Sequence, residues 1–308
     1  MTAPLATMID LTRLPRPLAI EDLDFKALQS AFMTRFVAEW TAQRAKDPTL
    51  PAFDVGNTRS DPVVLASRAF SYVRLLDRTR VNDAVAAVLA PLARGADLDN
   101  VAARLGVERL VLIRATDTEP AVMESDDRLL RRYLLAFSRP SAGSAARYLY
   151  EALTAWPQLL DAAVIGRAVH GRRGDTDVVL VGPDGRAPVA DEIALVRERL
   201  AAPGVKPEAT SVAVGAATRR LYSVEMTIQV SRGPDASAVA AEVEARVRKA
   251  GQARLYAGAE VPRDLLAGAA YGLSVIRADM PSPAADIPPD PYTVPVFSDV
   301  TVTPEVVA

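Results

Sequence analysis

Large apolar side chains recur every three or four positions near the start of the chain. Between residues 21 and 46 they are Phe25, Leu28, Phe32, Phe36 and Trp40. At this spacing they fall on one face of an α-helix, so the segment is predicted to be an amphipathic helix with an aromatic stripe. Prolines at positions 4, 15 and 17 oppose a regular helix before it, and residues 1–20 are expected to form an extended leader.

A second helix is predicted from residue 62 to about residue 90, because Asp61 can cap its first turn and Pro62 suits its first position. Its pattern is apolar on two sides. One side carries Leu65, Ala69, Tyr72 and Leu76, and the nearly opposite side carries Val63, Phe70, Val81, Val85 and Val88. We expect the aromatic stripe to cover one side and another molecule to cover the other. A simpler interpretation is that the many Ala and Val residues tolerate exposure. Together the two helices define a helical bundle segment over residues 21–93.

Residues 94–157 are predicted to form a helical middle domain. Its elements are a short helix near 97–105, a strand-like run at 110–114, a helix from Ser125 to about Arg139, and a helix that Gly143-Ser144 opens and Trp156-Pro157 ends. Both serines are favourable N-cap residues, and a residue before proline is disfavoured in a helix.

The hydrophobic period changes from helical to strand-like near Pro157. Residues 158–280 are therefore predicted to be a mixed domain, and the whole chain an α+β protein. Strands are expected at 160–166, 177–182, 211–216, 221–230 and 272–278, and helices at 189–202, 236–250 and 262–270. From residue 177 this order fits a ferredoxin-like split β-α-β sandwich.

Proline gathers at the end of the chain. The last 28 residues hold seven of the 23 prolines. Residues 281–308 are therefore expected to be an extended arm that becomes ordered on a neighbouring molecule, and not a packed element.

Composition excludes several classes of function. The chain has 308 residues and a net charge of −2, so it lacks the positive field that nucleic acids or anionic membranes attract. It has no cysteine and one histidine, which excludes thiolate chemistry and multi-histidine metal sites. His170 lies with Arg173-Gly174-Asp175 in a predicted hairpin tip and is expected to be exposed. No signal peptide or membrane span is expected, and the protein should be made and assembled in the cytoplasm.

The densest acidic cluster is Glu124, Asp126 and Asp127. These carboxylates could serve as an acid/base pair of a hydrolase or lyase, or bind a cation. The structural alternative is that carboxylates in the first turn of a helix interact favourably with its dipole. Because nothing else resembles a catalytic arrangement, we expect no catalytic, cofactor or metal site, and the hydrolase or lyase remains the alternative.

Residues 97–109 resemble the first helix and turn of a helix-turn-helix DNA-binding protein. Such a protein needs a second, polar helix in the major groove, whereas Leu110–Ile113 is an apolar, strand-like run. Arg128, Arg131 and Arg132 form a basic patch on a predicted helix, where a solvated or salt-bridged face is the default. DNA binding remains a second alternative.

Several short motifs follow one another in a fixed order. They are Ile9-Asp10-Leu11, Leu23-Asp24-Phe25, Arg80-Val81-Asn82-Asp83-Ala84, the segment 93–110, Ala121-Val122-Met123-Glu124-Ser125-Asp126, and Ser141-Ala142-Gly143-Ser144 with Tyr148. Their order and spacing resemble the baseplate J protein family of contractile-tailed bacteriophages. The resemblance is strong through residue 150 and moderate from there to about residue 280. Lys206-Pro207 departs from the Arg-Pro of the family, and the Arg172–Asp175 tip departs from its glycine-led strand.

The resemblance implies a structural subunit and not an enzyme. In that family two J-type subunits combine with one smaller baseplate I-type protein to form a wedge, their N-terminal helices bundle together, and six wedges close a ring around the tail hub. It implies further contacts with neighbouring wedge, hub and sheath-side proteins, and a location in the virion tail. We expect the aromatic stripe and the residues Val63, Phe70, Val81, Val85 and Val88 to form the subunit interface.

Overall fold

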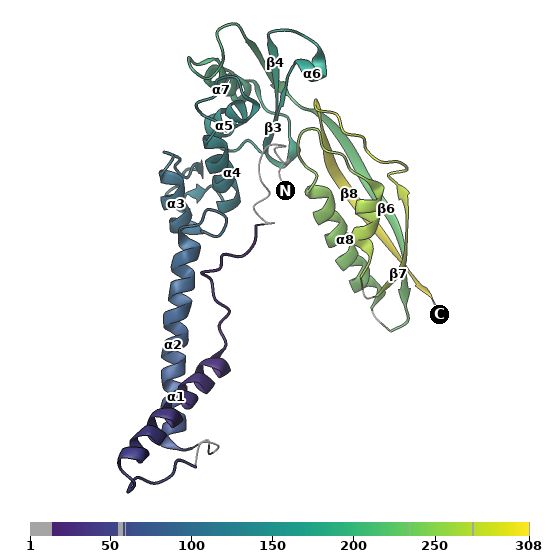
Figure 1. Cartoon of the computed structure of the whole chain (residues 1–308). Coiled ribbons are helices and arrows are strands. Elements are labelled where there is room, and N and C mark those ends of the chain that lie inside the picture. Colours follow the sequence, from purple (N-terminus) through teal and green to yellow (C-terminus); the bar gives the residue numbers. More distant parts are fainter. Residues whose placement is uncertain (1–13, 55–57, 59, 234, 273, 308) are drawn as a thin grey trace. The chain divides into compact units, whose positions relative to one another are not determined.

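The computed structural model describes residues 14–54, 58, 60–233, 235–272 and 274–307. They form two compact units, one within Ile9–Arg104 and one within Leu105–Ala308 (Figure 1). Helices and strands both contribute, so the prediction of a mixed α+β protein is confirmed. The predicted leader falls largely on residues 1–13, which lie outside the described residues.

The first unit is helical. Its helices are α1 (Phe25–Lys46), α2 (Pro62–Ala87) and α3 (Gly95–Ala103). The Asp24 side chain accepts a hydrogen bond from the backbone of the first turn of α1, and Asp61 does the same for α2. These caps determine where the helices begin, because they satisfy backbone N–H groups that have no partner within the helix.

The second unit begins with a two-stranded ribbon and two helices. Strands β1 (Val111–Ile113) and β2 (Val122–Met123) pair antiparallel, and they are followed by α4 (Asp126–Ala136) and α5 (Ala145–Ala155). Ser125 and Ser144 cap the two helices as predicted, and Trp156 ends α5.

A three-stranded sheet follows, with strand order β3-β4-β5. β3 (Asp161–Ile165) pairs antiparallel with β4 (Asp175–Val181), and β4 pairs parallel with β5 (Ser211–Ala216). The crossover between the parallel strands carries the short helix η2 (Pro183–Gly185) and the longer α7 (Ala190–Ala201).

A second three-stranded sheet has the order β7-β6-β8. Its long central strand β6 (Thr218–Ser231) pairs antiparallel with β7 (Val275–Ser282) and parallel with β8 (Thr293–Val307). Helices α8 (Ala236–Gln252) and α9 (Arg263–Ala270) complete this lobe. The core lies between helices and sheet and includes Val243, Val247, Ile228 and Leu266.

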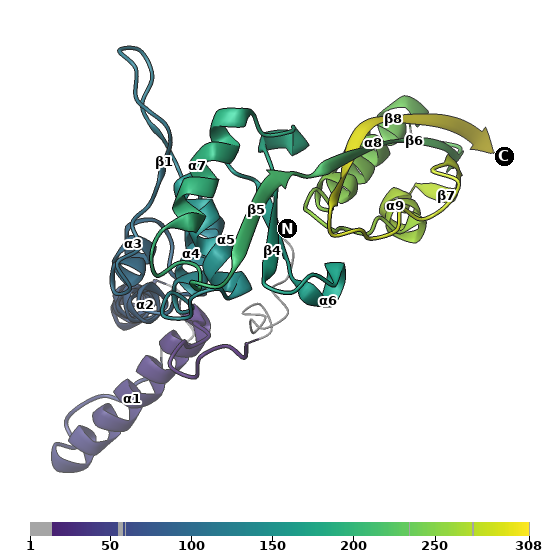
Figure 2. The same ribbon diagram turned by 90° about the horizontal axis from the view of Figure 1, so that it is seen from above.

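The predicted ferredoxin-like sandwich does not form, because the strands belong to two separate sheets. A ferredoxin-like sandwich would require the consecutive strands predicted at 211–216 and 221–230 to turn back and lie in one sheet. Only Ala217 separates β5 from β6, which is too short for the two-residue turn of a hairpin. The chain instead passes directly from β5 of one sheet into β6 of the other (Figure 2).

The expectation of an unpacked C-terminal arm is wrong. Residues 281–308 contain the end of β7 and all of β8, and Val294, Val296 and Val300 of β8 are buried. Proline lacks a backbone donor but is tolerated on an edge strand, where its nitrogen faces away from the neighbouring strand. β8 has only β6 as a partner among the described strands, so Pro295 and Pro304 are compatible with it.

Candidate functional site

The first candidate site is the surface of α2, beginning with its contact with α1. Ser67 and Ser71 of α2 are buried. Gln29 Nε2 of α1 donates a hydrogen bond to Ser67 Oγ at 3.2 Å, and the rings of Phe32 and Phe70 lie 5.2 Å apart. α1 therefore packs on a strip of α2 that includes Ser67 and Ser71, and it also touches Phe70 on one of the two apolar sides.

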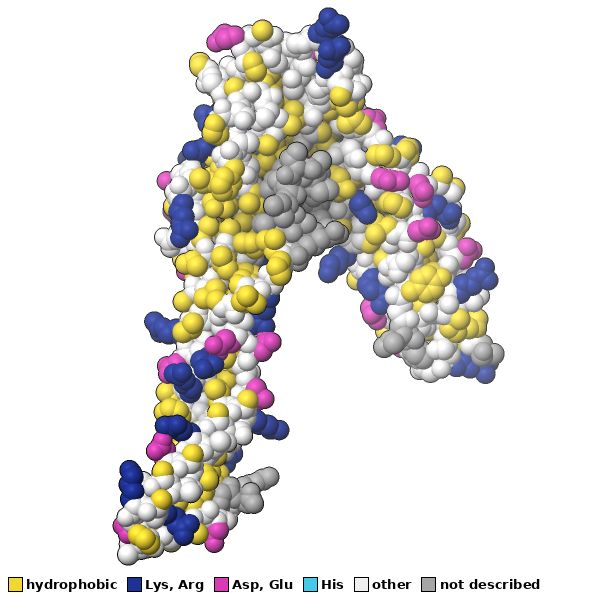
Figure 3. All heavy atoms as spheres, viewed as in Figure 1, with side chains coloured by type: hydrophobic (Ala, Val, Ile, Leu, Met, Phe, Trp, Pro, Cys, Tyr) yellow, Lys and Arg dark blue, Asp and Glu magenta, His cyan; other side chains and the backbone are white. Residues whose placement is uncertain are grey.

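Both apolar sides of α2 remain largely at the surface. Leu65, Ala69, Tyr72 and Leu76 are exposed on one side, and Phe70, Val81 and Val88 on the other, while Val63 and Val85 are half-buried. Tyr72 and Val81 retain 56 % and 58 % of their surface. The expectation that α1 covers one whole side is therefore wrong. Figure 3 shows hydrophobic side chains at the surface of this helical unit.

The aromatic stripe of α1 is half-buried along its length, at Phe25, Leu28, Phe32, Phe36 and Trp40. Its second half packs on the connection that leads to α2. The Phe36 ring lies 5.0 Å from that of Phe53, and Trp40 Nε1 donates a hydrogen bond to the Pro51 carbonyl at 3.0 Å. The connection therefore covers part of the area that was expected to lie on α2.

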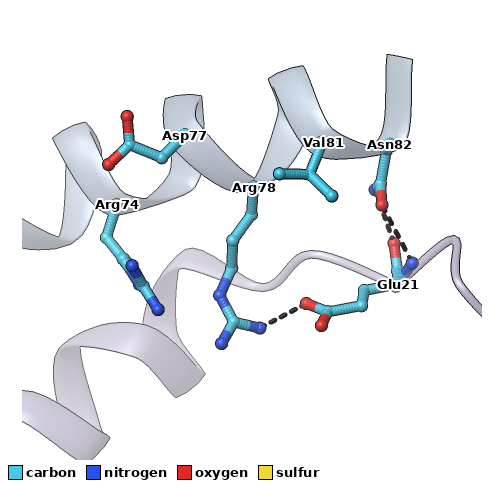
Figure 4. Close-up of a pocket in the computed structure, with 6 residues that line it drawn as sticks. All are labelled: Glu21, Arg74, Asp77, Arg78, Val81 and Asn82. Carbon is cyan, nitrogen blue, oxygen red and sulfur yellow. Dashed lines mark hydrogen bonds and ion pairs between the residues drawn. The ribbon is translucent and has the colours of Figure 1, made fainter. Parts of the chain in front are cut away.

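A hollow of about 210 Å³ lies between α2 and the residues that precede α1. Its lining is Glu21, Arg74, Asp77, Arg78, Val81 and Asn82 (Figure 4). Glu21 forms an ion pair with Arg78, and its backbone N–H and C=O both hydrogen-bond to the Asn82 side chain. Opposite charges line the hollow in equal number, so it does not select a ligand of either charge.

The predicted acidic cluster is divided between the interior and the surface. Glu124 is buried, and its Oε2 lies 2.6 Å from Arg132 Nη1. It also accepts a hydrogen bond from the Leu110 N–H at 3.1 Å. Asp126 forms an ion pair with Arg109 at 2.7 Å, whereas Asp127 is exposed. The three carboxylates therefore do not converge on one point where a substrate or cation could bind.

The predicted basic patch on α4 is salt-bridged. Arg131 lies 2.6 Å from the buried carboxylate of Asp161, and Arg128 Nε lies 3.3 Å from Glu124. Burial lowers the pKa of the Arg128 guanidinium, while the charge of Glu124 opposes this change. Asp161 also accepts the Ala257 N–H at 3.2 Å and so connects α4, β3 and the C-terminal lobe.

His170 lies, as predicted, in the connection between the antiparallel strands β3 and β4, where it ends the one-turn helix α6 (Arg167–His170). It is half-buried, so the expectation that it is exposed is wrong. The residues after it form a polar cluster. Asp177 accepts hydrogen bonds from Arg172 and from the Tyr292 hydroxyl, each at 2.6 Å. The Tyr292 hydrogen bond, followed by the Arg172 contacts, lowers the pKa of Asp177 despite the opposing effect of burial.

The helix-turn-helix interpretation fails after its first helix. α3 ends at Ala103, and the chain then continues through an irregular segment into β1 instead of a second helix. Over the described residues, no set of three or more histidine, cysteine, aspartate or glutamate side chains is arranged to hold a metal ion. No helix in this part of the chain has the length and apolar character needed to cross a membrane.

Sequence reasoning missed two groups of contacts. Glu124 was considered an acid of a possible active site, although the arginines four and eight residues later, on the helix that Ser125 caps, were a signal for ion pairs with it. Asn82 was noted only as part of a motif. Its partner Glu21 lies 61 residues away, and no local pattern indicates such a contact.

Two comparisons with known proteins give the family of this chain. The model of the Baseplate J-like N-terminal domain matches residues 59–116, which include α2, α3 and β1. The chain is 31 % identical over 302 residues to baseplate protein J of Escherichia phage P2, and the match covers 91 % of this chain and 92 % of that protein. This chain therefore belongs to the baseplate protein J family of bacteriophages.

Proposed function

We propose that this protein is a structural subunit of a phage tail baseplate and assembles through the exposed sides of α2. The observation that carries the proposal is the apolar surface on two sides of one helix. Extended apolar surface on a soluble protein marks a site of interaction with another protein. The baseplate role is supported by the similarity to baseplate protein J of phage P2.

The assembly that we propose is a wedge of a contractile tail. In it the chain combines with a second copy of itself and with a smaller baseplate I-type protein, and the wedges form a ring around the tail hub. Contacts with neighbouring wedge, hub and sheath-side proteins complete the structure. The interface comprises the aromatic stripe of α1 together with Val63, Phe70, Val81, Val85 and Val88, extended by Leu65, Tyr72 and Leu76.

The proposal assigns no catalysis to the acidic cluster. Glu124 and Asp126 form ion pairs with arginines, which supports a role in holding α4 and β1 together. The alternative of a carboxylate-dependent hydrolase or lyase has no further observation in its favour, and neither has DNA binding.

A charge placed on one apolar side tests the interface. Val81→Asp changes an exposed residue, so the isolated chain should fold normally by circular dichroism. In the assembly the carboxylate would be buried without a partner, at a cost on the order of 2 kcal/mol or more. Such a penalty weakens binding by about 30-fold or more. Co-purification with the co-expressed smaller subunit should therefore be lost.

Ala84→Asp is the matched control, because Ala84 is also exposed on α2 but lies between the two apolar sides. We expect this variant to co-purify normally. If Val81→Asp and Tyr72→Asp both co-purify as the unmodified chain does, α2 is not the interface.

A further inference from the structure

Glu21 is held against α2 by contacts from two neighbouring turns of the helix. Its backbone N–H donates a hydrogen bond to Asn82 Oδ1 at 3.0 Å, and its carbonyl accepts one from Asn82 Nδ2 at 2.9 Å. Its carboxylate forms an ion pair with Arg78 (Figure 4). Asn82 therefore uses both ends of its amide on the backbone of a single residue.

This pairing satisfies backbone groups that have no partner in a helix or strand. Glu21 precedes α1, which begins at Phe25. A side-chain amide offers one donor and one acceptor in the same plane, as a peptide group does. Asn82 therefore pairs with Glu21 in the way that a neighbouring strand would, but from the side of a helix.

The pairing also restricts the position of α1. A fully extended chain spans at most ~3.6 Å per residue, so the four steps from Glu21 to Phe25 keep the start of α1 within about 14 Å of the Glu21 backbone. α1 itself contains no fully buried residue. α1 is therefore weakly packed on α2, and the contact of Glu21 with Asn82, outside the helix, helps to hold α1 in place.

We propose that Asn82 is a positioning residue that holds α1 on the Ser67 and Ser71 strip of α2. In that position α1 touches Phe70 but leaves most of both apolar sides of α2 open to partners. The inference deepens the proposed function, since it explains what keeps the assembly surface available before assembly. The Arg78 ion pair is secondary, because both of its side chains are more than one-third exposed to solvent.

Spin labels on the full chain measure this position directly. The chain has no cysteine, so Ala38→Cys and Ala66→Cys, both at exposed positions, introduce the sole attachment sites. Pulsed electron–electron double resonance should give one narrow distance distribution between α1 and α2. Asn82→Ala and the nearly isosteric Asn82→Asp, which keeps an acceptor but loses the donor, should shift and broaden that distribution.

Asp83→Ala and Glu21→Gln are the matched controls. The first changes an exposed neighbour on α2, and the second removes only the charge that Arg78 contacts. Both should keep the narrow distribution, with circular dichroism confirming that every variant is folded. An unchanged distribution in Asn82→Asp, or equal broadening in Asp83→Ala, would overturn the inference. Because the isolated chain is measured, either result leaves the Tyr72→Asp experiment on assembly independent, since Tyr72 does not line the hollow that contains Glu21 and Asn82.

Discussion

At the scale of single residues, charged side chains in the second unit meet at buried positions. Glu124 contacts Arg128 and Arg132 of α4 and the backbone of Leu110. Glu151 of α5 is likewise buried, between Arg147 and Arg199. A buried charge is costly unless it is paired and hydrogen-bonded, so each of these carboxylates depends on its arginines, and they on it.

Removing Glu124 should therefore be strongly destabilising. Glu124→Ala leaves the buried guanidinium of Arg132 without its partner, and loss of one partner of a buried pair costs about 3–5 kcal/mol. Urea unfolding followed by circular dichroism measures the change. The exposed Asp127, changed to Ala, should cost less than about 1 kcal/mol. Similar values for the two variants would contradict the structural role of Glu124.

The Asp177 cluster predicts a dependence on pH. The Tyr292 hydroxyl is the first cause of the lowered pKa of Asp177, so Tyr292→Phe should raise that pKa. A carboxyl group whose pKa is lowered on folding contributes stability that is present above its unfolded pKa of ~3.9. That stability is lost as the pH falls through the pKa of the folded state. The unmodified chain should thus have a larger free energy of unfolding than Tyr292→Phe at neutral pH. This difference in stability should become smaller in acid. A carboxyl NMR titration measures the pKa, and an equal pKa in both proteins would refute this role of Tyr292.

At the scale of elements, local signals predicted helices well. Asp61, Ser125 and Ser144 cap helices as expected. Such helices can be predicted because the N-cap residue and the hydrophobic period both lie within one continuous segment of sequence. Pairing between distant segments was not predictable in this way. The alternation of buried valines in β8 was present in the sequence, but the density of proline outweighed it in our interpretation.

The same difference between local signals and contacts of distant segments applies to the candidate site. The two apolar sides of α2 could be predicted from its hydrophobic period, and both prove to be largely exposed. The position of α1 could not be predicted from the sequence. It depends on Ser67 and Ser71, whose small side chains give no strong sequence signal, and on a contact between Asn82 and Glu21, which are distant in the chain.

Truncation distinguishes a packed strand from a free arm. Removing residues 292–308 deletes β8 and strips Val294, Val296 and Val300 from the core. Each fully buried side chain of this size contributes about 1.5–3 kcal/mol, so the C-terminal lobe should lose cooperative unfolding or aggregate. Removing only residues 306–308 is the control and should have little effect. Normal cooperative unfolding of the longer truncation would restore the arm interpretation.

At the scale of the whole molecule, two units carry different kinds of surface. The second unit encloses apolar clusters between helices and sheets, whereas the helical first unit keeps much of its apolar surface exposed. A subunit of a large assembly is expected to differ from a soluble monomer in this way, because its partners complete the burial. Membership of the baseplate protein J family fits that property.

Photo-crosslinking in the assembled particle tests the central claim most directly. A benzoyl-phenylalanine at position 70 and another at position 72 each replace an exposed aromatic residue, one on each apolar side of α2. Both positions should form crosslinks to another subunit in the particle, identified by mass spectrometry, while position 84 should not. Crosslinks confined to the same chain at both positions 70 and 72 would contradict the assignment of α2 as the assembly interface.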